Sequence, residues 1–403
     1  MDKPKKLRIF AHMKKRICFL VDSIFTIGGV QRVTAVIAKA LADDYNVTIV
    51  TFDAPGDKDT TLYGLSDAPI RYRFFQYPSV GRLKNILCKA YSGFYRKFQP
   101  KSKWTSDLYA HSSFPAELRN ALARELSEGS YNTIVGVHAP LAVRLAAVKP
   151  QLQGTRCIGW IHNSFEALFG PTSLYIGQDR QRHYVYQLRK LDSTVVLCEH
   201  DAAVYRAYDP EIRPTVIYNP LTLAPGEPST GTSKRFLAVG RFSHLHKGFD
   251  ILIDAFHLFA EKNSDWTLDI VGEGPEESLY REKIAAYGLE KRIEIHPFTN
   301  HIQDYYSRSQ VYVLSSRWEG FGLVLVEAMA HGLPVVSSDL PTSLEIMGSF
   351  GLYFRNGNAE ELAEKLQEAT LMDFEDKRRE AFAIARRFDI HTIIPQWKKC
   401  LDI

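Results

Sequence analysis

The stretch 317-RWEGFGLVLVEAMAHGLPVVSSD-339 joins a polar, glycine-containing loop to an apolar helical pattern and then to a short β-branched run. It places one carboxylate, Glu319, in the loop and a second, Glu327, in the predicted helix. Because a buried acid is costly unless it is paired or hydrogen-bonded, two acids at one loop–helix junction indicate a bound group that carries hydroxyls. Free N–H groups at a helix start favour an anion, and Gly320 and Gly322 let that backbone approach a diphosphate closely.

The same order of elements opens both halves of the chain. An apolar run at 16–22 precedes a glycine-containing turn and an amphipathic helical pattern, and a second apolar run at 235–241 precedes another. Strand, glycine loop and helix form the first unit of a nucleotide-binding α/β domain. Short β-branched runs separated by helical patterns indicate further parallel strands, at 46–52, 133–138, 156–162 and 193–198, and at 266–272, 292–298, 311–316 and 334–338. We therefore predict an α/β protein with two tandem doubly wound domains.

The predicted boundary lies within residues 210–234, which are dense in Pro, Gly, Ser and Thr. We assign residues 13–215 to an N-terminal domain, 216–385 to a C-terminal domain and 386–403 to a C-terminal helix. Residues 1–12 are basic but lack the apolar core of a secretory signal, and we expect them to be an extension outside the fold.

Composition fits an ordinary globular protein with two domains: 403 residues, 45% hydrophobic and 24% charged. The net charge of +4 conceals an asymmetry, because residues 1–220 hold 30 Lys and Arg against 19 Asp and Glu, while 221–403 hold 20 against 27. The five cysteines are scattered without a CxxC pair, which argues against a zinc site or a disulfide framework. Reduced thiols in a cytoplasmic protein are therefore expected. No apolar run is long enough to span a membrane.

One segment departs from the α/β pattern. Residues 71–104 contain nine Lys or Arg, nine aromatics and no acid. Such a segment can lie on an anionic membrane surface or bind a polyanion, and Lys97, Lys101 and Lys103 would then make the contact. The alternative is a solvated basic face whose aromatic residues belong to the core. The sequence leaves both open.

Four motifs occur in a fixed order, at 28–32 (GGVQR), 239–250 (VGRFSHLHKGFD), 271–276 (VGEGPE) and 319–336 (EGFGLVLVEAMAHGLPVV). Together they resemble the retaining, nucleotide-sugar-dependent glycosyltransferases of family 4, over a match from Ile17 to about Trp397. The resemblance implies the GT-B fold, in which two Rossmann-like domains face each other and the C-terminal helix returns to the N-terminal domain.

The resemblance also implies a hexosyltransferase. It would move a sugar from a nucleotide-sugar donor, with a UDP-sugar favoured, to a hydroxyl of a glycan or lipid-linked acceptor. We expect a role in cell-surface polysaccharide or lipopolysaccharide synthesis, a place in the cytoplasm or at the inner membrane face, and no nucleic acid partner. The alternatives are a GT-B epimerase, an inverting transferase, or a non-catalytic nucleotide-sugar-binding subunit.

Donor-site roles follow from the resemblance. Glu319 is expected to bind hydroxyls of the donor sugar and Glu327 the ribose. Arg241 and Lys247 are expected to stabilise the charge that develops on the departing diphosphate, so no metal or other cofactor is expected. The plainer alternatives are surface cations and carboxylates that only stabilise a helix start. Residues of the loop and helix start complete the expected diphosphate site: Gly320, Phe321, Gly322 and Leu323.

The N-terminal motif and strand ends supply the remaining candidates. Gly28 and Gly29 are expected to face the donor phosphates or the acceptor, and Arg32 to assist either one. His162, at the end of a predicted strand, is assigned by the resemblance to the donor sugar, with His138 as its competitor. The resemblance also places three residues near the nucleotide: Gly272, Glu273 and Phe298.

Overall fold

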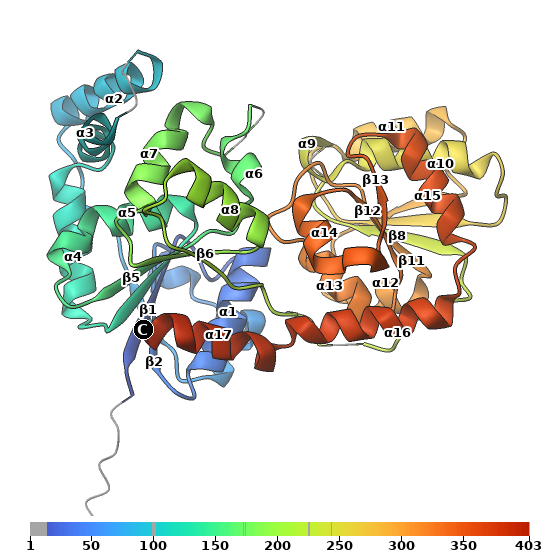
Figure 1. Cartoon of the computed structure of the whole chain (residues 1–403), viewed down its shortest axis with the longest axis horizontal. Coiled ribbons are helices and arrows are strands. Elements are labelled where there is room, and N and C mark those ends of the chain that lie inside the picture. Colours follow the sequence, from blue (N-terminus) through green and yellow to red (C-terminus); the bar gives the residue numbers. More distant parts are fainter. Residues whose placement is uncertain are drawn as a thin grey trace, which may run out of the picture.

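A computed structural model describes residues 14–98, 102–171, 173, 175–224, 226–242 and 244–402. Figure 1 shows two lobes side by side, each built from a sheet with helices packed on it, with the final helix lying along the first lobe. This is the α/β architecture of two doubly wound domains that the sequence predicts.

The N-terminal sheet has seven parallel strands in the order β3-β2-β1-β4-β5-β6-β7. They are β1 (Arg16–Val21), β2 (Asn46–Thr51), β3 (Arg71–Phe74), β4 (Thr133–Val137), β5 (Arg156–Trp160), β6 (Ser193–Val196) and β7 (Pro214–Val216). The strand order reverses between β1 and β4, and a crevice for ligands forms at the carboxyl ends of strands at such a point.

The C-terminal sheet has six parallel strands in the order β10-β9-β8-β11-β12-β13, reversing between β8 and β11. They are β8 (Arg235–Val239), β9 (Thr267–Val271), β10 (Ile293–His296), β11 (Val311–Leu314), β12 (Val335–Ser338) and β13 (Leu352–Phe354). The first sheet ends at Val216 and the second begins at Arg235, so the connection between them runs through the stretch rich in Pro and Gly.

Helices cover both sheets (Figure 1). In the first domain they are α1 (Gly29–Leu41), α2 (Arg82–Lys97), α3 (Lys103–Ser113), α4 (Ala116–Glu128), α5 (Ala139–Val148), α6 (Phe165–Phe169), α7 (Gln178–Leu188) and α8 (Glu199–Tyr208). Those that follow are α9 (His244–Lys247), α10 (Phe249–Ala260), α11 (Glu277–Ala286), α12 (Ile302–Arg308), α13 (Leu323–Ala330), α14 (Pro341–Met347), α15 (Ala359–Ala369), α16 (Phe374–Ala385) and α17 (Ile390–Asp402).

Every predicted strand is present, and three short strands, β3, β7 and β13, were not predicted. Strand β3 lies inside the basic aromatic segment, where Tyr72 and Phe74 pack against Phe25 with ring centroids 5.3 and 6.1 Å away. Some aromatic residues of this segment thus belong to the core, as one alternative has it, and the membrane contact of the other stays a prediction. Tyr95 is buried in the core, whereas Phe94 and several apolar neighbours on α2 are exposed.

Helix α17 returns to the first domain. The Trp397 ring lies 4.6 Å from that of Trp160, and the Thr133 hydroxyl donates to the Leu401 carbonyl at 3.1 Å. Arg156 Nε donates to the Cys400 carbonyl at 3.0 Å. These contacts attach the last helix to β4 and β5, and the Phe19 ring, 6.4 Å from that of Trp397, adds β1, so the helix links the two domains. No helix in the described part of the chain combines the length and apolar character needed to span a membrane.

Candidate active site

A cleft of about 740 Å³ lies between the domains, where the carboxyl ends of both sheets face each other. Two helix N-termini point into it, that of α1 through Gly28 and Gly29 and that of α13 through Gly320, Phe321 and Gly322. Its other described lining residues are Asp22, Ile27, Val30, Gln31, Arg32, His138, Pro140, His162, Asn163, Leu168, Tyr175, Ile176, Asn219, Arg241, His246, Lys247, Leu323 and Val324, together with Glu319. Most of the predicted site residues therefore meet in one place.

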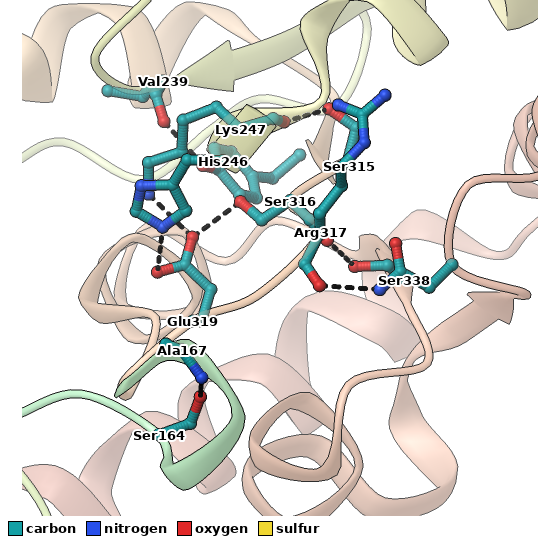
Figure 2. A network of polar contacts seen from close by, with 12 residues as sticks. Ser164, Ala167, Val239, His246, Lys247, Ser315, Ser316, Arg317, Glu319 and Ser338 are labelled. Carbon is teal, nitrogen blue, oxygen red and sulfur yellow. Dashed lines mark hydrogen bonds and ion pairs between the residues drawn. The ribbon is translucent and has the colours of Figure 1, made fainter. Parts of the chain in front are cut away.

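Glu319 is the centre of a polar network on the C-terminal side (Figure 2). Lys247 Nζ and Ser316 Oγ both donate to its Oε1, at 2.7 and 2.6 Å, and His246 Nε2 lies 3.9 Å from Oε2. Burial alone would raise the pKa of Glu319, but the Lys247 ammonium, the neighbouring His246 and the two hydrogen bonds outweigh it and hold the pKa below its usual range. The side chain is thus a fixed, ionised hydrogen-bond acceptor.

The turn that carries Lys247 is set by the next residue. Gly248 has φ +63°, and a Cβ there would overlap the carbonyl oxygen of Ser315, so glycine is required for α10 to begin against β11. Ser315 Oγ in turn donates to the Lys247 carbonyl at 2.9 Å, as Figure 2 shows. This local packing aims the Lys247 side chain at Glu319.

Arg241 differs from Lys247. It follows β8, lines the cleft and is exposed, and it has no ion pair with any residue that the structure describes. Its fork of N–H groups is therefore available to an anion, whereas the Lys247 ammonium is paired with a carboxylate.

Glu327 does not line the cleft, although its predicted partner is a ribose. It is 2% exposed, and its two oxygens accept from Arg32 of the opposite domain and from the Tyr306 hydroxyl at 3.0 Å. His331 Nδ1 lies 2.8 Å from the Glu327 carbonyl, and its Nε2 accepts from the Gly226 N–H. In this arrangement the carboxylate joins the two domains through Arg32, and its contact with ribose stays a prediction.

His162 and His138, the two competing histidines, both line the cleft, with ring centroids 5.3 Å apart. His162 is 7% exposed, and its Nε2 has no hydrogen-bond partner among the described residues. Burial lowers the pKa of both, most strongly for His162, so both are neutral near pH 7. His138 has φ 74° and ψ 151°, a conformation that costs a non-glycine residue about 1–3 kcal/mol and is found mainly at functional sites.

Besides Glu327, three candidates of the donor site lie outside the cleft lining: Gly272, Glu273 and Phe298. A Cβ at Gly272 would overlap the Gly240 carbonyl, and the Phe242 N–H donates to the Glu273 carbonyl at 2.8 Å. This turn therefore supports the loop that carries Arg241 rather than facing the cleft. Phe298 is 44% exposed and is not among the lining residues.

The glycines at the starts of the two helices lie where the two domains approach each other. A Cβ at Gly320 would overlap the carbonyl of His162 in the other domain, and one at Gly29 would lie 3.6 Å from Leu323. The Gly28 N–H donates to the Tyr63 hydroxyl at 2.8 Å. Close approach between the domains therefore explains glycine at position 320, whereas a Cβ at Gly29 would make an ordinary van der Waals contact.

Two of the three lysines proposed for a membrane contact are described by the structure, and neither lines the cleft. Lys97 is exposed on α2, and Lys103 pairs with Glu211 at 3.1 Å. Lys101 lies outside the described residues.

Several cleft residues were not singled out from the sequence. Asp22 directly follows β1, and Asn219 lies in the stretch assigned to the domain boundary, buried, with an Oδ1 that has no partner among the described residues. His246 precedes Lys247 in a motif already noted, so its position was the available signal. Tyr175 comes from the segment between α6 and α7, where nothing in the sequence pointed to it.

A possible metal group lies away from the cleft. In the described part of the chain, Asp269, Glu294 and His296 have atoms close enough to share an ion. Asp269, however, accepts from Arg235 at 2.6 Å and from Arg308 at 2.8 Å. Its carboxylate is already compensated by two cations, which is the arrangement of a buried ion-pair network.

Models of known families match nearly the whole chain. Residues 27–224 match the model for Glycosyltransferase Family 4, and residues 223–387 match that for Glycosyl transferases group 1. The chain belongs to glycosyltransferase family 4. As a glycosyltransferase it is an enzyme, and the cleft between its domains is the candidate active site.

Relatives of this glycosyltransferase differ in how much they share with it. An uncharacterized glycosyltransferase of Haemophilus influenzae is 25% identical over 403 residues, covering 96% of this chain and all of that protein. The amylovoran biosynthesis glycosyltransferase AmsD of Erwinia amylovora is 39% identical over 108 residues, 27% of this chain and 30% of its own. Among solved structures, HepE of Anabaena in complex with UDP has a TM-score of 0.70 at 21% identity, covering 96% of this chain and 99% of its own. The structural likeness shows the GT-B fold.

Proposed function

We propose that this glycosyltransferase moves a sugar from a nucleotide-sugar donor, preferably a UDP-sugar, to a hydroxyl of a glycan or lipid-linked acceptor with retention of the anomeric configuration. The observation that carries the proposal is the pairing, in one cleft, of the ionised Glu319 network with the unpaired cation of Arg241. HepE, similar in fold, is solved in complex with UDP, which supports the donor. AmsD acts in amylovoran biosynthesis, which supports a role in polysaccharide synthesis.

Each group has a role in the proposed reaction. Arg241 binds the diphosphate and stabilises the charge that grows on it as the glycosyl–phosphate bond breaks. Glu319 accepts hydrogen bonds from donor-sugar hydroxyls, and Lys247 and Ser316 hold its carboxylate in place. Glu319 is committed to these contacts, so we assign the acceptor's proton to the leaving diphosphate, on the same face of the sugar. No step in this scheme requires a metal.

Slow hydrolysis of the donor tests this assignment without knowledge of the acceptor. We expect one or more of a panel of UDP-, GDP- and ADP-sugars to raise the melting temperature and to be hydrolysed slowly to free nucleotide. Glu319→Gln should lower hydrolysis by about 10- to 150-fold, the value of a charge-assisted hydrogen bond of about 1.5–3 kcal/mol. Glu290→Gln, at an exposed position, is the matched control. Equal rates for the two variants, or no hydrolysis of any donor, would contradict the proposal.

We also propose that α2 places the enzyme on an anionic membrane. Leu83, Ile86 and Leu87 are 73%, 62% and 62% exposed on this basic helix, which lies with α3 at the end of the first domain away from the second (Figure 1). Apolar side chains flanked by cations suit the boundary between acyl chains and anionic headgroups.

Vesicle sedimentation tests the membrane contact. Replacing Lys97, Lys101 and Lys103 together by Gln should weaken binding to vesicles with phosphatidylserine or phosphatidylglycerol, since each nearby cation contributes about 1 kcal/mol. Changing Leu83, Ile86 and Leu87 to Ser should weaken it further. Leu371→Ser, equally exposed but on the other domain, is the control. Unchanged sedimentation of both triple variants would refute the contact.

A further inference from the structure

The N-terminal side of the cleft has the chemistry of a hydroxyl-binding surface. Its polar side chains include the carboxylate of Asp22, the imidazole of His138, the amide of Asn163 and the phenol of Tyr175, beside His162, which the resemblance assigns to the donor sugar. These groups come from the carboxyl ends of β1, β4 and β5 and from the segment before α7. Carboxylates accept hydrogen bonds only, whereas a neutral imidazole and an amide both donate and accept, so together they match a group rich in hydroxyls.

Apolar side chains complete this surface. Pro140, Leu168 and Ile176 line the same part of the cleft as the polar groups. On such a surface, the polar groups can hydrogen-bond to the edge of a small ring, and the apolar side chains can pack against the faces of that ring. A sugar residue has that character, with hydroxyls at the edge and C–H groups on each face.

The charges of the cleft leave no cation for a second anion. Of the three described cations that line it, Arg32 is paired with Glu327 and Lys247 with Glu319. Only Arg241 is without an ion pair to a described residue, and the donor diphosphate takes it under the proposed function. The three histidines that line the cleft, His138, His162 and His246, are kept neutral by burial, which lowers the pKa of each.

Asp22 carries the remaining charge on this side. It is exposed at the end of β1, and its side chain has no hydrogen bond or ion pair with any residue in the described ranges. Like charges repel, so a phosphate or carboxylate on the acceptor's reacting residue is disfavoured here. His138, held beside this position by its strained backbone, contributes a neutral ring instead of a compensating cation.

We propose that the reacting residue of the acceptor is an uncharged sugar and that Asp22 determines this preference by accepting hydrogen bonds from its hydroxyls. The inference rests on the proposed function and names the chemical class of its acceptor. Anionic groups elsewhere in the acceptor, such as a lipid diphosphate, lie outside this surface and are compatible with it.

The test uses the full-length enzyme and whichever nucleotide sugar it hydrolyses. Octyl glycosides of glucose, galactose, mannose, N-acetylglucosamine and N-acetylgalactosamine are compared with octyl glucuronide and octyl glucoside 6-phosphate, and products are counted by mass spectrometry. We expect transfer to at least one neutral glycoside and at least tenfold less to both charged ones. Asp22→Asn should lower the ratio of transfer to donor hydrolysis about tenfold through a higher acceptor KM.

Two further variants sharpen the result. Asp43→Asn removes the same charge from an exposed position outside the cleft and should leave the ratio unchanged. Asp22→Lys should shift the preference toward octyl glucuronide. Transfer to no neutral glycoside, equal use of charged and neutral glycosides by the wild type, or the same ratio for Asp22→Asn and Asp43→Asn would each overturn the inference. Absence of donor hydrolysis would instead count against the proposed function.

Discussion

At the scale of single residues, the state of Glu319 depends on one lysine. Burial favours the protonated acid, and Lys247, with help from His246 and Ser316, reverses that preference. A carboxyl whose pKa is lower in the folded than in the unfolded protein adds stability above its unfolded pKa and loses it as the pH falls through the folded value. The ionised form needed for hydroxyl binding therefore persists to acidic pH in the wild type.

Lys247→Met should change the pH dependence of the reaction. Without the ammonium, burial dominates and the pKa of Glu319 rises, so the acidic limb of donor hydrolysis moves to higher pH while the maximal rate also falls. The measurement is kcat/KM for donor hydrolysis from pH 4 to 9. Lys291→Met, at an exposed position, should keep the wild-type profile. An unshifted acidic limb in Lys247→Met would mean that this lysine does not control the carboxylate.

At the scale of elements, the start of α10 shows how packing positions a functional side chain. Gly248 and Gly288 have nearly the same φ, +63° and +64°, but of the two only Gly248 has a carbonyl oxygen where a Cβ would stand. Alanine in the left-handed conformation costs about 1–2 kcal/mol at either position. At Gly248 the overlap with Ser315 adds to that cost, because the strand β11 backbone has to move.

Gly248→Ala should therefore destabilise the protein by about 2 kcal/mol more than Gly288→Ala, within the range of mutations that introduce backbone strain or overpacking. Urea unfolding of the two variants measures the difference. The same shift displaces Lys247, so donor hydrolysis should fall in Gly248→Ala alone. Equal urea midpoints for the two variants would show that the backbone around Ser315 accommodates the added Cβ with no loss in the free energy of unfolding.

At the scale of the whole molecule, the order of apolar runs was enough to predict both sheets. The motif around Glu319 was enough to predict the cleft where the carboxyl ends of their strands face each other. The short strands β3, β7 and β13 were not predicted, because a run of three or four residues is too short to show the alternating pattern of a strand. Asp22 and Asn219 were not predicted as cleft residues, because a single polar residue after a strand has no sequence pattern that marks it as part of a site. The pairing of Arg32 with Glu327 was beyond reach for another reason: it depends on how two domains with separate sequence patterns face each other.

That pairing is expected to hold the domains together. Glu327 is buried, so removing Arg32 leaves a carboxylate with only the Tyr306 hydroxyl as its side-chain partner in the described structure, and breaking a buried pair costs about 3–5 kcal/mol unless the domains separate. Arg32→Met should lower the melting temperature and increase the radius of gyration measured by small-angle X-ray scattering. Arg32→Met combined with Glu327→Gln should recover part of the stability, because no unpaired charge remains, whereas Arg32→Lys should retain most of it. Additive effects of the two single changes, with no change in the radius of gyration, would show that the domains are held by their other contacts, among them the approach of Gly320 to His162.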